Sequence, residues 1–149
     1  MKFTHLAALM LAALTTATAL AQAKPEDQIK YRQSAMVVGA RSVAALNAMA
    51  KGDVPFNPEQ AQAHANVLAN LTRVDAALAA YGPGTDKGAP TKAAPKIWSE
   101  PAQFKAAFDR FATASQALPA AAGSVATLKG ALADLGKTCK GCHDDYRQR

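Results

Sequence analysis

The chain ends in VATLKGALADLGKTCKGCHDDYRQR, residues 125–149, which holds its only two cysteines in the C-x-x-C-H motif Cys139-Lys140-Gly141-Cys142-His143. Two thiols and an imidazole at this spacing are typical of covalent haem c attachment, in which the thiols form thioethers with the porphyrin and the histidine binds the iron. We therefore predict one covalently bound haem c, held by Cys139 and Cys142, with His143 as the proximal axial ligand.

Apolar residues recur at spacings of three and four through this stretch. The series contains both cysteines and consists of Val125, Leu128, Leu132, Leu135, Cys139, Cys142 and Tyr146. Such spacing indicates one face of an amphipathic helix. The thiols are therefore expected to face the same interior as the leucines.

Residues 1–23 have the pattern of a secretory signal peptide. Lys2 precedes an apolar run from about Leu6 to Leu20, and Ala21-Gln22-Ala23 is a small-x-small cleavage site. The run is too short and too rich in Ala and Thr to predict a membrane span. We expect residues 24–149 to form one exported domain in the periplasm, the compartment in which bacteria attach haem c.

Two other uses of the cysteine motif are less well supported. In a thiol–disulfide oxidoreductase the pair lies near a βαβ pattern at the start of a helix, whereas this chain has no strand pattern and its pair lies near a predicted helix end. A structural zinc site needs about four ligands, and after the signal peptide the chain offers only two cysteines, His64 and His143. We expect His64 to be a partly exposed helix residue and not a ligand.

The formal net charge of +6 is spread along the chain. The chain has no basic block and no alternation of aromatic and basic residues, so nucleic-acid binding is not predicted. The charge is expected to give a mildly basic, solvated surface.

Four helical segments account for most of residues 24–149. They are expected over about residues 25–50, from the N-cap Asn57 to Tyr81, from Ser99 to about Leu118, and through the C-terminal stretch. The predicted inward residues of the first three are Ile29, Met36, Ala40 and Val43; Val67, Leu68, Leu71, Val74 and Leu78; and Phe104, Phe108, Phe111 and Leu118. Four amphipathic helices of similar length predict an all-α, antiparallel up-down four-helix bundle with a covalently bound haem.

A four-helix chain with its C-x-x-C-H motif near the C-terminus resembles the class II cytochromes c, specifically the cytochrome c-prime family. Segments similar to that family, in its order, are Lys24-Pro25-Glu26-Asp27, Tyr31-Arg32-Gln33-Ser34-Ala35, Tyr81-Gly82-Pro83-Gly84-Thr85, Ile97-Trp98-Ser99 and Cys142-His143-Asp144-Asp145-Tyr146-Arg147. The resemblance implies a periplasmic haem protein that carries electrons or binds nitric oxide or carbon monoxide, and that is not an enzyme.

The resemblance also assigns site residues. Arg32 and Gln33 are expected against the haem and its propionates, and Arg147 beside the proximal imidazole, although a solvated helix face is an alternative for both arginines. Leu78 is counted among the haem contacts.

Met36 matches the family position that faces the iron opposite the histidine. It is expected either as an apolar plug over five-coordinate iron, the reading we favour, or as the sixth ligand of a low-spin His/Met electron-transfer cytochrome. No histidine lies at helical spacing from Met36 to act as the distal acid–base group of a peroxidase.

The resemblance implies a homodimer formed through the first two helices, and an unidentified periplasmic redox partner. Small residues on outer helix faces would allow close approach, and those expected there are Ala44, Ala48, Ala65 and Ala69.

Overall fold

The computed structural model describes residues 23–73 and 75–149. The predicted signal peptide lies outside these residues except for Ala23, so it stays a prediction. None of the helices in the described ranges is long and apolar enough to cross a membrane.

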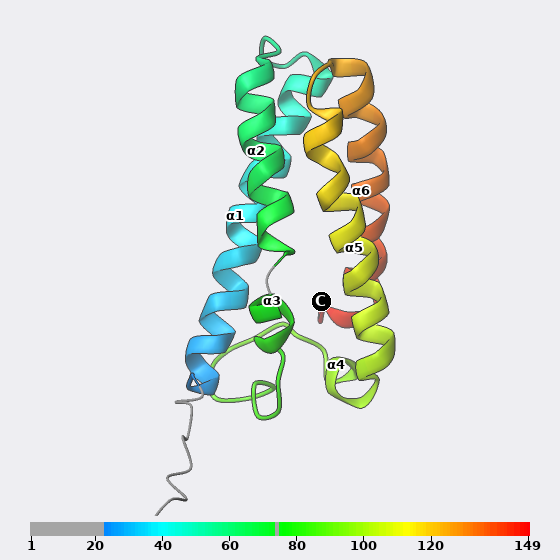
Figure 1. The fold of residues 1–149 in the computed structure, drawn as a ribbon. Coiled ribbons are helices and arrows are strands. Elements are labelled where there is room, and N and C mark those ends of the chain that lie inside the picture. Colours follow the sequence, from blue (N-terminus) through cyan, green and yellow to red (C-terminus); the bar gives the residue numbers. More distant parts are fainter. Residues whose placement is uncertain (1–22, 74) are drawn as a thin grey trace, which may run out of the picture.

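The described residues form an up-down bundle of four long helices (Figure 1). The long helices are α1 (Pro25–Lys51), α2 (Pro58–Leu71), α5 (Pro101–Ala121) and α6 (Val125–Tyr146), and the short ones are α3 (Asp75–Ala79) and α4 (Lys96–Ser99). Helix α1 packs against α2 and α6, and α5 packs against α2 and α6, so neighbours around the bundle are antiparallel. The predicted four-helix bundle is confirmed.

The two short connections close one end of the bundle. Gly52 ends α1 in the left-handed conformation (φ 86°), which glycine adopts without steric cost. Asn57 caps α2 by accepting a hydrogen bond from the Gln60 N–H (3.0 Å), as predicted. Ser124 caps α6 by accepting from the Thr127 N–H (3.3 Å). Helices α3 and α4 lie at the opposite end, where α6 also ends (Figure 1).

Two predicted helices are interrupted in the structure. The segment expected from Asn57 to Tyr81 stops at Leu71, because the Thr72 hydroxyl donates to the Ala69 carbonyl (2.9 Å) and competes with the helical ladder. The segment expected from Ser99 is broken at Glu100 (φ −129°, ψ 56°), since a residue before proline is disfavoured in the helical region.

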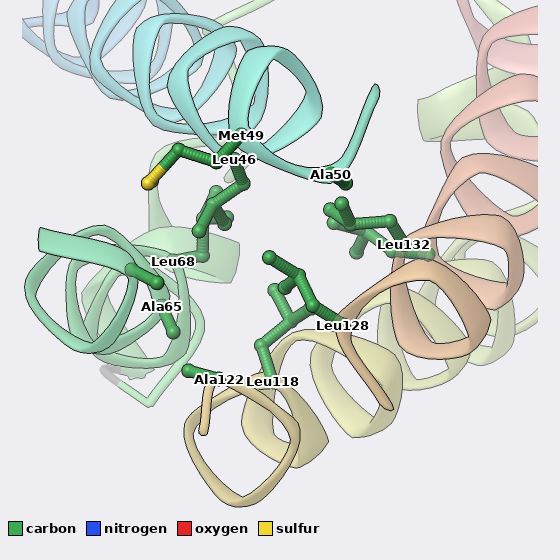
Figure 2. Packing of buried hydrophobic residues seen from close by; sticks show 11 residues of the cluster. Leu46, Met49, Ala50, Ala65, Leu68, Leu118, Ala122, Leu128 and Leu132 are labelled. Carbon is green, nitrogen blue, oxygen red and sulfur yellow. The ribbon is translucent and has the colours of Figure 1, made fainter. Parts of the chain in front are cut away.

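The buried side chains form two clusters. The first fills the closed end with leucine and alanine, and its members are Leu46, Met49, Ala50, Ala61, Ala65, Leu68, Leu118, Ala122, Leu128, Leu132 and Leu135 (Figure 2). The second lies toward the other end and consists of Ile97, Phe104, Ala107 and Tyr146, with Leu78, Tyr81, Ala93, Trp98 and Cys142 packed against it.

Some residues lie on a different helix face from the one predicted. Ala40 and Met36 are both exposed, and α1 instead buries Arg32, Ser42 and Leu46. Ala65 and Ala69 are buried and do not lie on an outer face. Since Ala is compatible with either face of a helix, its sequence position alone does not assign it. The aromatic stripe of α5 is inward as predicted, with Phe104 and Phe108 buried.

Candidate functional site

The C-x-x-C-H motif lies in the last two turns of α6, at the junction of the two buried clusters. Cys139 packs against the leucine-rich cluster and Cys142 packs against the aromatic one, and both are half-buried free thiols. The predicted series is confirmed along the helix, with Leu128, Leu132 and Leu135 buried before the cysteines. The thiols are thus presented to an apolar interior, as attachment to a porphyrin requires.

The environment of the thiols does not suit a thiol–disulfide oxidoreductase. Burial raises the pKa of Cys139, and burial followed by the charge of Cys139 raises the pKa of Cys142. A reactive thiolate needs a lowered pKa, as found at a helix N-terminus. These thiols lie toward the opposite end of α6, so the structure argues against that alternative.

His143 is exposed at the last turn of α6, where its imidazole is accessible for coordination. Partial desolvation lowers its pKa, the Arg147 charge lowers it further, and the Asp144 carboxylate acts in the opposite direction. A lowered pKa favours the neutral imidazole, which is the form that binds a metal. Arg147 is exposed one turn later, and its backbone N–H donates to the His143 carbonyl (3.3 Å).

Met36 lies on the inward series of α1, between Arg32 and Gly39. Arg32 is 4% exposed and Gly39 faces α2, where an added Cβ would lie 3.6 Å from Leu71 Cδ1. Met36 itself is 42% exposed. Helix α1 packs against α6, which carries the two half-buried thiols. The uncovered surface of Met36 on this side of α1 is compatible with a large apolar group held between the two helices.

Arg32 is buried, and the two terminal nitrogens of its guanidinium donate four hydrogen bonds. Nη1 donates to the Ala80 carbonyl (2.9 Å) and to Thr85 Oγ1 (3.1 Å), while Nη2 donates to the Thr85 carbonyl (2.8 Å) and to Thr91 Oγ1 (3.0 Å). A guanidinium has five N–H donors, so these bonds leave the Nε–H for another acceptor. The solvated alternative for Arg32 is wrong.

Two aromatic rings complete the surroundings of this guanidinium. Its central carbon lies 4.9 Å from the centroid of Tyr81 and 5.6 Å from that of Trp98, both within cation–π range. The Trp98 Nε1–H donates to the Gly82 carbonyl (3.2 Å). Burial lowers the pKa of Arg32, and Tyr81 acts in the opposite direction.

Gln33 is exposed and its Nε2 donates to the Pro90 carbonyl (2.9 Å). Together, Arg32 and Gln33 hold the connection between α3 and α4 against α1. Sequence reasoning missed this role and missed Thr91 entirely, because the partners are 48 to 59 residues away in sequence.

Leu78 and Cys142 are brought together in the aromatic cluster. Tyr81 stacks edge-on against Phe104 (4.9 Å between centroids), and Phe104 does so against Tyr146 (5.2 Å). His64 is half-buried, and its Nδ1 lies 3.4 Å from Ser42 Oγ, between α2 and α1. It lies in the packing of these two helices, and its partial exposure on a helix is as predicted.

Comparison with known proteins gives consistent matches over most of the chain. Residues 27–147 match the family model described as Cytochrome C'. Cytochrome c' of Rubrivivax gelatinosus is 43% identical over 128 residues, covering 85% of this chain and 98% of that protein, and its crystal structure has a TM-score of 0.79.

Two further solved structures have the same fold. Cytochrome c' of Thermochromatium tepidum has a TM-score of 0.81 at 34% identity, covering 87% of this chain and 100% of that one. A nitric oxide complex of a cytochrome c prime variant from Alcaligenes xylosoxidans has a TM-score of 0.76 at 40% identity, covering 85% and 98%.

The Arg32 bonds predict a test of the connection they hold. In Arg32→Met the acceptors at Ala80 and Thr85 lose their charged donor, which should lower the free energy of unfolding by roughly 2–4 kcal/mol. Trypsin should then cleave after Lys87 or Lys92 faster in the native protein, as followed by mass spectrometry. Arg41→Met, an exposed change on the same helix, is the control. Equal cleavage rates in both variants would contradict the anchoring role.

Proposed function

Since the chain belongs to the cytochrome c' family, and its cofactor is therefore one covalently bound haem c, we propose that it is a periplasmic haem protein that binds diatomic gases and exchanges electrons. Cys139 and Cys142 would hold the porphyrin through thioethers, and His143 would be the proximal ligand. The iron would supply reversible binding of small ligands and one-electron redox chemistry. The chain's own contribution is to attach, orient and shield this group.

The observation that carries gas binding is the partly uncovered Met36 on the inner face of α1. An unbranched thioether side chain adapts its shape readily, so Met36 can cover a site and yield to a ligand as small as nitric oxide or carbon monoxide. The relative from Alcaligenes xylosoxidans that was solved as a nitric oxide complex supports this proposal. Five-coordinate iron with Met36 as an apolar plug is the form that we propose.

The alternative function is electron transfer by a low-spin His/Met cytochrome, and this function also depends on Met36. A thioether ligand would fill the sixth position, and an external gas would have to displace it. The two functions differ in whether the Met36 sulfur is bonded to the iron, which spectroscopy distinguishes. Either would require an unidentified redox partner in the periplasm, which the predicted signal peptide supports as the location.

We also propose that the protein is not an enzyme. Catalysis of the peroxidase type uses a second histidine as an acid–base group near the iron. Of the two histidines in the described residues, His143 is the proposed ligand and His64 lies between α1 and α2 beside Ser42. Binding and electron exchange are the functions that the available side chains support.

The exposed apolar side chains of the described residues support the proposed homodimer. Met36 apart, which is assigned to the inner face, the large ones lie on α1 or directly after it, and are Tyr31, Val37, Val38 and Val54. Tyr31 and Val38 are seven residues apart and so share one face of α1. Because such a face is buried when two copies pair through it, we propose that a second copy covers it. Ala44, predicted to allow close approach of helices, is exposed on the same helix.

Attachment provides the direct test of the cofactor residues. Haem should remain with the wild-type polypeptide through acid–organic extraction, because thioether bonds survive it. Replacing both Cys139 and Cys142 with Ala should give apoprotein or extractable haem, whereas Lys140→Ala, an exposed change between them, should keep the haem bound. Free extraction of haem from the wild-type protein would refute the assignment.

Absorption and electron paramagnetic resonance spectra of Met36→Ala decide between the two functions. We expect high-spin iron in wild type and variant, with faster carbon monoxide and nitric oxide binding in the variant because the plug is removed. Val37→Ala, 70% exposed in wild type, is the control. A low-spin wild type whose Met36→Ala variant becomes high-spin would instead establish the methionine ligand and make electron transfer the leading function.

Sedimentation measurements test the dimer. The wild type should associate reversibly, and Val38→Glu should weaken association by about tenfold or more, because it places a charge in an apolar contact. Val54→Glu adds the same charge beyond α1 and should have a smaller effect. A wild-type mass that stays monomeric at every concentration would rule the proposal out.

A further inference from the structure

The connection between α3 and α4, which we name the 80–95 loop, is fastened at one side to α1. The Arg32 guanidinium holds Ala80, Thr85 and Thr91, and Gln33 holds Pro90. The Thr85 hydroxyl, while accepting from Arg32, donates to the Gly82 carbonyl (2.8 Å), so the turn at this point is also closed on itself.

At its other side the 80–95 loop pairs with the residues that end α6. The Ala94 N–H donates to the Tyr146 carbonyl (3.0 Å), and the Gln148 N–H donates to the Lys92 carbonyl (2.8 Å). These two bonds make an isolated antiparallel bridge between Ala93 and Arg147. Arg147 accordingly leaves the helical conformation and becomes extended, at φ −122° and ψ 126°.

Thr91 joins the two sides. Its Oγ1 accepts from the Arg32 Nη2 (3.0 Å) and also from the Ala93 N–H (3.1 Å), which uses both lone pairs of the hydroxyl oxygen. A single half-buried side chain therefore connects the guanidinium on α1 to Ala93, the residue that pairs with Arg147. Without this hydroxyl, Arg32 would keep its other three acceptors, but the Ala93 N–H would lose its partner.

From this chain of contacts we propose that Thr91 is a positioning residue, which fixes the backbone of Arg147 and so holds its guanidinium at the His143 end of the haem site. The proposal rests on the proposed haem function, because its purpose is to keep a constant cationic environment beside the proximal imidazole. The bridge to Ala93 restrains the backbone of Arg147, and this limits the positions that its exposed side chain can reach.

The same contacts give Thr91 a second consequence. Arg32 and Met36 lie one turn apart on α1, while Arg147 follows His143 by four residues, directly after the end of α6. Through Thr91 the 80–95 loop therefore ties the helix that carries the proposed distal residue to the helix that carries the proximal one. A change in the distance between α1 and α6 at this end would strain the two hydrogen bonds of the Ala93–Arg147 bridge.

The test compares Thr91→Val, which removes the hydroxyl at nearly constant size, with Thr91→Ser, which retains it, in the haem-containing protein. Thr113→Val is the control, since Thr113 Oγ1 is exposed and donates only within α5, to the Asp109 carbonyl. Two quantities are measured by nuclear magnetic resonance: hydrogen exchange at the Ala94 and Gln148 amides, and the hyperfine-shifted ring-proton resonances of His143.

In Thr91→Val we expect exchange at both amides to be about tenfold faster, as for the loss of one hydrogen bond, together with a shift of the His143 resonances. Thr91→Ser should match wild type in both quantities, and Thr113→Val should change neither. Unchanged exchange in Thr91→Val would overturn the proposal. Faster exchange with unmoved His143 resonances would also overturn it, because Thr91 would then only stabilise the loop.

These readouts are independent of gas binding. If the haem-containing wild type fails to bind nitric oxide and carbon monoxide, the proposed gas-binding function is wrong, while the amide exchange and the imidazole resonances still decide the role of Thr91. The ring resonances of an iron-bound histidine are shifted in both high-spin and low-spin ferric protein, so the coordination state of Met36 does not affect the choice of readout.

Discussion

The buried guanidinium of Arg32 determines the structure of the bundle end that contains α3 and α4. Removing a charge from water is costly unless hydrogen bonds replace the lost hydration. Arg32 meets this requirement with neutral oxygens from Ala80, Thr85 and Thr91 and with the faces of two aromatic rings. Because these acceptors must converge on one group, they set the course of the 80–95 loop. The course of the loop in turn brings its later residues to the end of α6.

The two ends of the bundle solve the packing problem differently. The closed end uses alanine and leucine, which let the four helices approach closely around a continuous apolar cluster (Figure 2). The other end uses aromatic rings in edge-to-face contact, together with the short helices α3 and α4. The cysteines lie where these two kinds of packing meet. The haem protein is therefore built with its attachment points at a natural boundary in the core.

Periodicity and motif predict the parts of the molecule that depend on neighbouring residues. The series from Leu128 to Tyr146 gives the helix, its buried face and the placement of both thiols, and Asn57 gives a helix start. The breaks at Thr72 and Glu100 were not predicted, because a side-chain hydroxyl and a following proline interrupt the helix locally without changing the apolar spacing. The partners of Arg32 were not predictable either, since contacts across 48 to 59 residues leave no periodic signal. Ala65 was misplaced because alanine fits both environments.

The bridge between Ala93 and Arg147 bears on how the chain reaches its native state. Closing a large loop has a higher entropic cost than closing a small one, and contacts between distant residues generally form late. The closed end joins its helices through short turns, at Gly52 to Asn57 and at Ala122 to Ser124. The turns between α1 and α2 and between α5 and α6 therefore have a lower entropic cost of closure than the Ala93–Arg147 bridge, so we expect the bridge to form after these helical pairs.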